Sequence, residues 1–362
     1  MKHILFAVSS LYGGGAERVV SVWASGLAKK GYKVSVLVYS RMENEYPIDN
    51  DVEVYTIANS QKECNDMSIL TRLKLFRKKL KEIKPDVVIS FLSIIQIYIR
   101  LTSIGLHIPR IETVRNNPWE IKKGLNKIYS KLWLNCFKGC NKLIVQSEDQ
   151  KIFFDVKVQD KAVVIPNPIN ESYLQNCKTE YNANSHKIIA AGRLTPQKNY
   201  KMMIDAVKIA SQKYGDITLE IYGVGELYDE LNIYIKAQGL SDKITLMGRS
   251  DSLYKLYTER DLYLMSSNYE GMPNALAEAM AIGLPCISTD CKTGPRDLIE
   301  NGKNGYLVEV ANADAMAEKI MGFFSLADYE QKSIGENARK KIIDFCSEEN
   351  SLSRLIRLID EI

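Results

Sequence analysis

Short apolar runs alternate with stretches of helical periodicity along the whole chain, and this alternation constrains the fold more than any other feature. The runs are rich in β-branched residues and read ILFAV, KVSVLVY, DVVISF, RIETV and KLIVQ in the first half, then KIIAA, ITLEIYG, ITLM, DLYLM, PCIST and GYLV in the second. Strands that are apolar on both faces belong to parallel sheets covered by helices on both sides. The pattern therefore predicts an α/β protein with two doubly wound, Rossmann-like domains.

The border between the two blocks lies in IPNPIN, residues 165–170, where two prolines end a strand and interrupt any helix. We expect an N-terminal domain at 1–168 and a C-terminal domain at 169–343. Residues 344–362 predict a C-terminal helix that packs back toward the N-terminal domain. A chain of 362 residues is long enough for two separate cores.

Cysteine usage and hydropathy bear on the compartment. Seven cysteines occur without paired spacing, as expected for free thiols in a reducing compartment. Cys136 and Cys140, four residues apart on one expected helix, read as core residues rather than metal ligands. No apolar run reaches the roughly 18 residues needed to span a bilayer. The opening MKHILFAV reads as a first strand rather than a signal peptide, because a glycine turn and an amphipathic helix follow it. We expect a cytoplasmic protein.

Charge is distributed unevenly between the two halves. Residues 1–170 hold 26 Lys and Arg against 16 Asp and Glu, whereas the remainder holds 22 against 28. Two basic stretches, 70–84 and 119–142, carry apolar or aromatic residues among their lysines. They are either core-packed helices with solvated lysines or a peripheral docking surface for anionic lipid on the inner face of the cell membrane. We expect no nucleic-acid partner.

Doubly wound sheets bind ligands beyond the carboxyl ends of their strands, so the turns there are informative. Gly13-Gly14-Gly15 follows the first strand and favours close approach of a phosphate or sugar, although it is not the G-x-G-x-x-G fingerprint. Arg193 and Lys198 follow the first strand of the second domain, with Lys198 expected one turn into a helix. Both can point at one anion, which favours a diphosphate site over two solvated charges.

A third turn holds two acids in the stretch SNYEGMPNALAEAM. Glu270 precedes a Gly-Met-Pro turn, whose amides together with that of Asn274 lie at the positive end of a helix dipole. Glu278 lies among alanines two turns into the helix, where an isolated carboxylate is costly unless something binds it. A carboxylate in that position suits the two adjacent hydroxyls of a ribose.

These motifs, in this order, resemble glycosyltransferase family 4. The resemblance rests on G-G-G-A-E-R, G-R-L-T-P-Q-K-N and E-G-M-P-N-A-L-A-E-A-M-A-I-G-L-P, with IPNPI, YGVGE and IENGKNGYLV as further matches, and it covers nearly the whole chain. It implies the GT-B fold, in which two Rossmann-like domains face each other across a cleft. It also implies a retaining, nucleotide-sugar-dependent hexosyltransferase that needs no metal and no other cofactor.

The resemblance further implies roles for single residues. Arg193, Lys198 and Glu270 would be catalytic, with the two cations on the diphosphate and Glu270 on the donor sugar. Glu278 would bind the nucleotide ribose. The remaining donor contacts would be Gly14, Gly15, Gly271, Met272, Pro273 and Asn274. We expect a UDP-linked hexose or N-acetylhexosamine as donor and a glycan or polyprenyl-diphosphate-linked saccharide of bacterial polysaccharide or lipopolysaccharide synthesis as acceptor. The new linkage would be α.

One departure from the family pattern concerns a histidine that many members carry after the fourth N-terminal strand. This chain reads Glu112-Thr113-Val114-Arg115-Asn116-Asn117-Pro118 there, and none of His3, His107 and His186 lies in a convincing catalytic turn. Arg115 and Asn116 become candidate sugar or acceptor contacts. No protein nucleophile is indicated, since a departing phosphate oxygen can take the acceptor proton in a front-face transfer.

Alternatives from other classes stay open at this point. Asp49 and Asp51 have the D-x-D spacing of a metal site, although their polar surroundings favour a surface turn. Alternating strands with a glycine turn also suit an NAD-dependent oxidoreductase. A sugar-nucleotide epimerase or a phosphorylase shares the two-domain architecture, and a non-catalytic binding subunit would retain the motifs.

Overall fold

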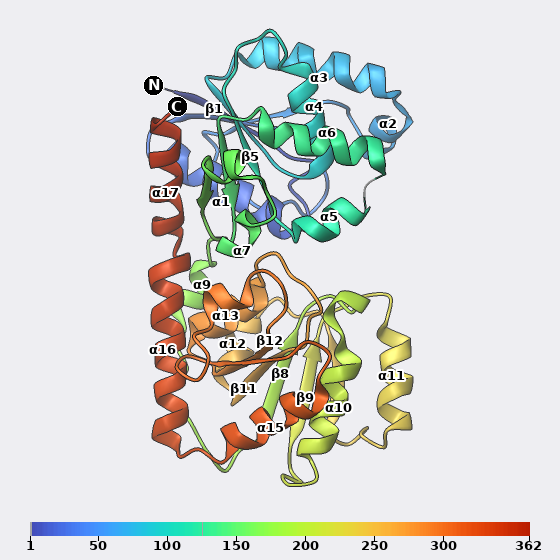
Figure 1. Ribbon diagram of the computed structural model, residues 1–362, viewed down its shortest axis with the longest axis vertical. Coiled ribbons are helices and arrows are strands. Elements are labelled where there is room, and N and C mark those ends of the chain that lie inside the picture. Colours follow the sequence, from blue (N-terminus) through green and yellow to red (C-terminus); the bar gives the residue numbers. More distant parts are fainter. Residues whose placement is uncertain (1, 125) are drawn as a thin grey trace. The chain divides into compact units, whose positions relative to one another are not determined.

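The computed structural model describes residues 2–124 and 126–362, so that Met1 and Leu125, the latter in the second basic stretch, lie outside the described residues. The chain forms two compact units, and Figure 1 labels many of their helices and strands. Unit 1 comprises Met1–Pro168 and Glu348–Ile362, and unit 2 comprises Ile169–Ser347. The sequence placed the second border at 343/344, whereas α16 (Asp328–Cys346) runs to the end of unit 2.

Unit 1 is built on a seven-stranded parallel sheet in the order β3-β2-β1-β4-β5-β6-β7. Its strands are β1 (His3–Ala7), β2 (Lys33–Val38), β3 (Glu53–Thr56), β4 (Val87–Ser90), β5 (Arg110–Thr113), β6 (Lys142–Val145) and β7 (Ala162–Val164). The central strands are buried along nearly their whole length because helices cover both faces. From β1 the strands are added toward one edge of the sheet up to β3, and from β4 they are added toward the other edge. The carboxyl ends of β1 and β4 therefore form a topological switch point.

The helices of unit 1 mostly begin at side-chain caps. They are α1 (Gly15–Lys29), α2 (Gln61–Asp66), α3 (Ile69–Ile83), α4 (Ser93–Thr102), α5 (Pro118–Gly124), α6 (Lys127–Lys138), α7 (Glu148–Lys151), α8 (Val156–Gln159) and α17 (Glu348–Asp360). Ser68, for example, accepts from the amide of Thr71 to start α3. Helix α17 packs on α1, where the indole of Trp23 donates to the buried hydroxyl of Ser351 at 2.9 Å.

Unit 2 has a six-stranded parallel sheet in the order β10-β9-β8-β11-β12-β13. Its strands are β8 (Lys187–Ala191), β9 (Thr218–Tyr222), β10 (Ile244–Gly248), β11 (Leu262–Met265), β12 (Cys286–Thr289) and β13 (Tyr306–Val308). Its helices are α9 (Glu171–Gln175), α10 (Tyr200–Ala210), α11 (Tyr228–Ala237), α12 (Leu253–Thr258), α13 (Asn274–Ile282), α14 (Pro295–Leu298), α15 (Ala313–Phe324) and α16. Here the switch point lies between β8 and β11.

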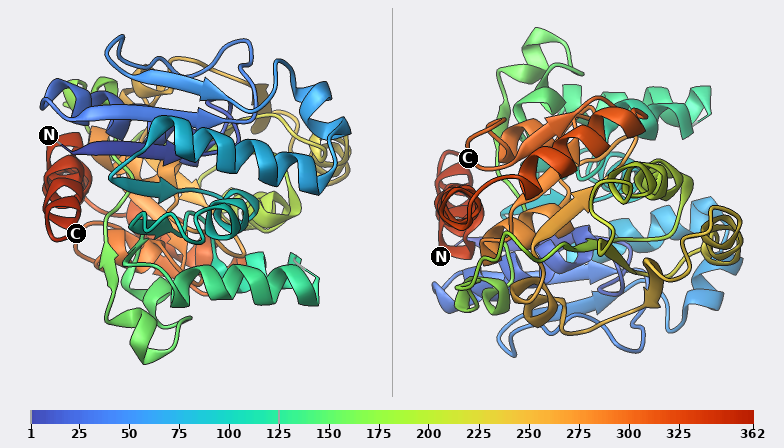
Figure 2. Two further views of the ribbon diagram at one scale, coloured as in Figure 1. Left: turned by 90° about the horizontal axis from the view of Figure 1, so that it is seen from above. Right: turned by 90° about the horizontal axis from the view of Figure 1, so that it is seen from below.

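The predicted fold class is confirmed, since both halves are doubly wound parallel sheets with helices on both faces (Figure 2). Each apolar run named from the sequence forms a strand. Cys140 was expected on the same helix as Cys136, but α6 ends at Lys138 and Cys140 follows it. None of the helices in the described ranges combines the length and the apolar character that crossing a membrane requires.

Candidate functional site

Two loops meet at the switch point of unit 2, and hydrogen bonds join them side by side. One follows β8 and contains the 3-10 turn η1 (Pro196–Lys198), and the other follows β11 and runs from Ser266 to Pro273. The amide of Asn268 donates to the carbonyl of Gln197 at 2.8 Å, and the hydroxyl of Ser266 donates to the carbonyl of Lys198 at 2.7 Å. The backbone that carries the predicted cation is thereby fixed against the backbone that carries the predicted acid.

The side chains of Lys198 and Glu270 form an ion pair across these loops. Lys198 Nζ lies 2.6 Å from Glu270 Oε1, and both side chains are largely buried. Lys198 is not one turn into a helix as expected, because η1 ends there and Asn199, with φ of 47°, separates it from α10. A side chain at Gly192 would contact Lys198 Cε at 3.1 Å, so the glycine leaves room for the lysine to reach across.

Two further side chains hold the Glu270 carboxylate in place. The hydroxyl of Ser267 donates to Oε1 at 2.7 Å, and the amide of Gln197 donates to Oε2 at 3.3 Å and to the carbonyl of Tyr269 at 2.9 Å. Glu270 is 6% exposed, so its oxygens depend on these donors in place of water. Sequence reasoning did not find Ser267 or Gln197 as supports, since each becomes recognisable only once the two loops are adjacent.

The turn after Glu270 leads into the N-terminus of α13. Pro273 is the N-cap of this helix, and its side chain makes no cap hydrogen bond. Gly271 and Met272 are buried in the turn before it. The hydroxyl of Thr293 donates to the carbonyl of Glu270, and this hydrogen bond ties the turn to the loop that follows β12. Such a helix start favours negative or polar ligand groups.

Glu278 lies on α13, eight residues after Glu270. It is 7% exposed, as the sequence indicated. Burial raises the pKa of the Tyr263 hydroxyl far above its usual value, and the charges of both Glu270 and Glu278 contribute to that shift. Tyr263 thus lies within electrostatic reach of the two acids. Arg193, in contrast, is exposed, and the described residues supply no ion-pair partner for it.

The glycine turn of unit 1 lies at the corresponding switch point after β1. Gly14 is the N-cap of α1, and Glu17 occupies the third position of that helix. The Glu17 side chain folds back over Gly14, and burial raises its pKa. A helix dipole stabilises such a carboxylate by only about 0.3–1 kcal/mol. Removing the charge from water costs several kcal/mol, so the dipole alone does not account for its burial.

Arg115 lies at the carboxyl end of β5 and is packed against aromatic rings. Its guanidinium is centred 4.5 Å from the ring of Trp23 and 5.2 Å from that of Phe91, and Nη1 donates to Asn167 Oδ1 at 3.2 Å. Burial lowers its pKa to about 9. The Asn116 side chain accepts from the amide of Asn117 at 2.8 Å. Within the described residues, Arg115 Nε and Nη2 are buried without a hydrogen-bond partner, and Asn116 is exposed. The predicted contacts of Arg115 and Asn116 to sugar or acceptor stay predictions.

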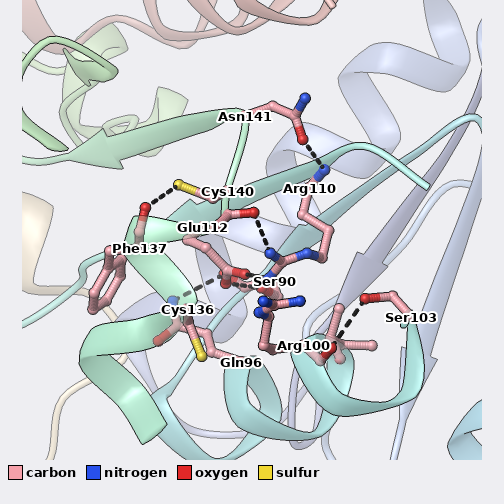
Figure 3. Close-up of polar contacts among 12 residues, drawn as sticks. Ser90, Gln96, Arg100, Ser103, Arg110, Glu112, Cys136, Phe137, Cys140 and Asn141 are labelled. Carbon is pink, nitrogen blue, oxygen red and sulfur yellow. Dashed lines mark hydrogen bonds and ion pairs between the residues drawn. The ribbon is translucent and has the colours of Figure 1, made fainter. Parts of the chain in front are cut away.

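A second buried acid of unit 1, Glu112 on β5, was not singled out from the sequence. Figure 3 shows its carboxylate between Arg110 Nη1, at 2.7 Å, and the hydroxyl of Ser90 on β4. Arg110 also donates to the carbonyl of Gly139 after α6. Burial raises the pKa of Glu112 to about 7, against the opposing effects of Arg110 and of the Ser90 hydrogen bond. This network joins β4, β5 and α6.

The other candidate metal or catalytic residues weighed from the sequence have contacts typical of turns or of the protein core. Asp49 Oδ1 accepts from the amide of Asp51 at 3.0 Å, which is the geometry of a polar turn. His3 Nε2 lies 2.8 Å from the hydroxyl of Ser35 inside unit 1. Burial raises the pKa of Cys140 to about 12, as expected for a core thiol. Within the described residues, no cluster of three or more His, Cys, Asp or Glu is arranged to hold a metal.

Comparison with known proteins places both halves of the chain among known families. A model described as Glycosyltransferase Family 4 matches residues 13–173, and one described as Glycosyl transferases group 1 matches residues 176–341. An N-acetylgalactosaminyltransferase of Campylobacter jejuni, named for a GalNAc-GalNAc-diNAcBac-PP-undecaprenol acceptor and an α-1,4 linkage, is 28% identical over 352 residues. The match covers 95% of each chain.

Other similar proteins share this architecture. An Escherichia coli UDP-Gal:α-D-GlcNAc-diphosphoundecaprenol α-1,3-galactosyltransferase is 28% identical over 78% of this chain and 77% of its own length. The crystal structure of Anabaena HepE with UDP-glucose superposes with a TM-score of 0.79 at 17% identity, covering 100% of both chains. TarM, with a TM-score of 0.80 at 17% identity, covers 99% of this chain and 98% of its own.

Proposed function

Because this chain belongs to the glycosyltransferases of family 4 and has their GT-B fold, we propose that it transfers a hexose or N-acetylhexosamine from a UDP-sugar to a polyprenyl-diphosphate-linked glycan, with retention and an α-linkage. The single observation that carries the donor half is the Lys198–Glu270 ion pair across the switch point of unit 2. This pair supports the proposal because a cation suits a diphosphate and a carboxylate suits the hydroxyls of a sugar.

The proposed chemistry is a displacement at the anomeric carbon. The bond from that carbon to the diphosphate oxygen breaks, a bond to the acceptor hydroxyl oxygen forms, and the hydroxyl proton passes to the departing phosphate. Lys198, with Arg193 on the same loop, stabilises the charge that develops on the leaving group. Glu270 accepts hydrogen bonds from hydroxyls of the sugar, the α13 amides face the ligand, and Glu278 holds the ribose. No metal is required in this scheme.

The acceptor class is supported by the relatives. The Campylobacter jejuni and Escherichia coli proteins are both named for undecaprenol-linked saccharides joined through a diphosphate, and both form α-linkages. Bacterial surface-polysaccharide synthesis is therefore the proposed setting. An oxidoreductase or epimerase is not favoured, since the matched families are glycosyltransferases. A non-catalytic binding subunit would bind the same ligands but would transfer no sugar, so an activity assay separates it from the proposed enzyme.

A lipid-linked acceptor agrees with the charge of one helical layer, the basic layer, defined as α3, α4 and α6. These helices pack side by side (Figure 2) and hold ten Lys and Arg with one acid, Glu82. Leu70 of α3 and Ile128 of α6 are 71% and 73% exposed. Basic side chains among exposed apolar ones suit the surface of an anionic bilayer, so we propose peripheral docking through this layer.

Vesicle sedimentation tests the docking. Replacing Lys74, Lys78 and Lys81 of α3 by Glu should weaken binding to phosphatidylglycerol vesicles at least about 100-fold, since each basic residue contributes about 1 kcal/mol at an anionic surface. The matched control replaces the exposed Lys208, Lys213 and Lys236 of unit 2 by Glu. Equal losses in both triple variants, or equal binding to phosphatidylcholine, would contradict the docking surface.

The donor site is tested by a thermal-shift screen of the purified chain against UDP, GDP, ADP, NAD and a panel of UDP-sugars. Stabilisation by UDP and by one or two UDP-sugars is expected, because a ligand that binds only the folded state raises the melting temperature. The Glu278→Ala variant should bind UDP about 10- to 100-fold more weakly, as expected for loss of hydrogen bonds to a charged group. A shift with NAD alone, or no shift with any nucleotide, would overturn the proposal.

A further inference from the structure

Helix α13 carries amides and a carboxylate that the proposed function assigns to the donor, and it is buried along most of its length. Every residue from Leu276 to Ile282 is buried, and neither glycine nor proline interrupts the helix. A helix without such a break moves as one rigid rod, here about 13 Å long at about 1.5 Å per residue. Whatever holds its C-terminal end therefore also sets the position of its N-terminal end and of Glu278.

Three consecutive carbonyls at the C-terminal end of α13 receive hydrogen bonds from other parts of unit 2. The pairs are Arg339 Nη1 of α16 to the carbonyl of Ala281, the amide of Lys178 to that of Ile282 at 2.8 Å, and the hydroxyl of Tyr181 to that of the C-cap Gly283 at 2.8 Å. Carbonyls at a helix end have no partner inside the helix, so these donors take the place of water. The end of α13 is thereby joined to three separate positions.

Arg339 contributes the largest share of these contacts. Besides bonding to Ala281, its Nη1 donates to the carbonyl of Asn176 at 3.0 Å, and its Nη2 donates to that of Leu174 in α9 at 2.5 Å. One guanidinium thus holds three carbonyls from two segments, which suits a planar fork of donors better than a single ammonium. Its positive charge also lies at the negative end of the α13 dipole.

Two glycines allow α16 to approach the end of α13 closely. Gly283 ends α13 in the left-handed conformation, with φ of 89°. A Cβ added at Gly335 of α16 would overlap the carbonyl oxygen of Gly283 and the hydroxyl of Tyr181. A Cβ added at Gly322 of α15, in contrast, would meet nothing within 4 Å. The close approach at Gly335 brings Arg339, about one helical turn later, to the carbonyls of α13.

We propose that Arg339 is a positioning residue of the donor site. By holding the C-terminal end of α13 against α9 and α16, it sets where the helix start and Glu278 lie relative to the nucleotide. The inference rests on the proposed function, which assigns these groups to the donor. Arg339 acts through the helix, because it binds the end of α13 that lies about 13 Å from the helix start. Its loss weakens donor binding without removing any group that contacts the donor.

The test is isothermal titration calorimetry of the full chain with UDP, which gives a dissociation constant and a stoichiometry separately. Arg339→Gln should raise the dissociation constant about 2- to 13-fold, as expected when one hydrogen bond between the helix and the nucleotide is lost. Arg339→Lys keeps the charge without the fork and should lie between wild type and Arg339→Gln. Gly335→Ala should also raise the constant, because it pushes α16 away from α13 and leaves the guanidinium in the chain.

Two control variants match these changes. Lys161→Gln removes a cation that donates to the carbonyls of Lys138 and Cys140 after α6, a helix end in unit 1. Gly322→Ala adds the same methyl group as Gly335→Ala in open space. Both controls should bind UDP with the wild-type dissociation constant.

The stoichiometry separates positioning from a purely structural role. Loss of folded protein lowers the stoichiometry and leaves the dissociation constant of the remaining molecules unchanged, whereas a displaced helix raises the constant at the wild-type stoichiometry. A wild-type constant in Arg339→Gln would overturn the inference. If that variant does not fold, a wild-type constant in Arg339→Lys and Gly335→Ala would overturn it, as would equal losses in the controls. Failure of wild type to bind UDP would instead contradict the proposed donor function, so the two failures are distinguishable.

Discussion

Glu270 in unit 2 and Glu17 in unit 1 occupy comparable positions, yet their surroundings differ. Each follows the strand that borders the switch point of its sheet, and they are 6% and 9% exposed. The Glu270 carboxylate receives donors from Lys198, Ser267 and Gln197, whereas the part of the chain that the structure describes gives the Glu17 carboxylate no ion pair. The first is preorganised by the protein, whereas burial raises the pKa of the second.

Glu112 extends this comparison to an acid that is part of a strand, as the third of the four residues of β5. It is fully buried between two strands and is held by Arg110 and Ser90. Burial alone therefore does not distinguish a functional acid from a structural one. The distinction comes from the place of each acid in the fold. Glu270 lies in a loop that follows a strand, where ligands of doubly wound sheets bind, whereas Glu112 is part of strand β5.

The largest effect is expected from removing the cation that holds Glu270. Lys198→Ala should lower kcat by about 100- to 1,000-fold, because the leaving diphosphate loses a preorganised positive charge in a largely buried site. Steady-state kinetics with the donor found in the nucleotide screen measures the change. The matched control is Lys201→Ala. Lys201 lies three residues after Lys198, is exposed and forms an ion pair with Glu230. An exposed pair of this kind contributes at most about 1 kcal/mol, and kcat should stay near the wild-type value.

Equal kcat values for Lys198→Ala and Lys201→Ala would contradict the catalytic role of Lys198. They would mean that the ion pair in unit 2 serves only the stability of the two loops. Melting temperatures of both variants separate that outcome, since a purely structural pair lowers stability and leaves the turnover of the folded enzyme unchanged.

The second effect concerns pH and the structural acid Glu112. Its folded pKa of about 7 exceeds the ordinary value, so the folded state binds the extra proton between about pH 4.5 and pH 7. Its contribution to stability is present below that window and is lost as the pH rises through it. The unfolding free energy of wild type minus that of Glu112→Gln should therefore fall by at most about 1.4 kcal/mol for each pH unit in the window. Denaturant titrations of both proteins at pH 5, 6, 7 and 8 measure this difference.

A flat difference across that range would mean that Arg110 and Ser90 keep Glu112 ionised throughout. Glu112 would then resemble Glu270 as a buried carboxylate whose charge is stabilised by its hydrogen-bond donors. Glu63→Gln, which removes an exposed acid of the same unit, is the control and should give no comparable slope.

Much of the fold could be predicted because its signals are local. Apolar runs such as VVIS and CIST are buried on both faces wherever they lie in a parallel sheet, so composition alone indicates their structure. The end of α6 was missed because Gly139 ends the helix before Cys140, and an apolar pattern does not show that limit. Lys198 was placed in a helix because the left-handed conformation of Asn199 is not visible in the sequence.

The site could be predicted only in part, because its signals are both local and long-range. Lys198, Glu270 and Glu278 stand in turns next to strands, where polar residues are conspicuous. Ser267 and Gln197 are polar residues in polar loops, and only the adjacency of β8 and β11 gives them a role. Glu17 was quoted within a motif, but its burial is a property of the folded state.

A smaller effect is expected from loosening Glu270 without removing it. Ser267→Ala deletes one donor to Oε1 and leaves Lys198 and Gln197 in place. Loss of one such hydrogen bond costs about 0.5–1.5 kcal/mol, which corresponds to a roughly 2- to 13-fold decrease in kcat/KM. Ser267→Thr retains the hydroxyl and should recover most of the loss. If neither variant changes kcat/KM, Ser267 does not position the carboxylate.

The smallest effect, and the one that separates two accounts of the leaving group, is expected from chelation. In the proposed scheme the positive charge comes from Lys198 and Arg193, so activity should be unchanged by EDTA. Asp49, the alternative metal ligand, already accepts a hydrogen bond from the amide of Asp51, as acids in polar turns commonly do. Asp49→Asn would keep that acceptor and should leave activity unaltered. Complete loss of activity in EDTA, restored by manganese in wild type but not in Asp49→Asn, would transfer the role of the Lys198 cation to a metal and leave the Lys198–Glu270 pair as a structural contact.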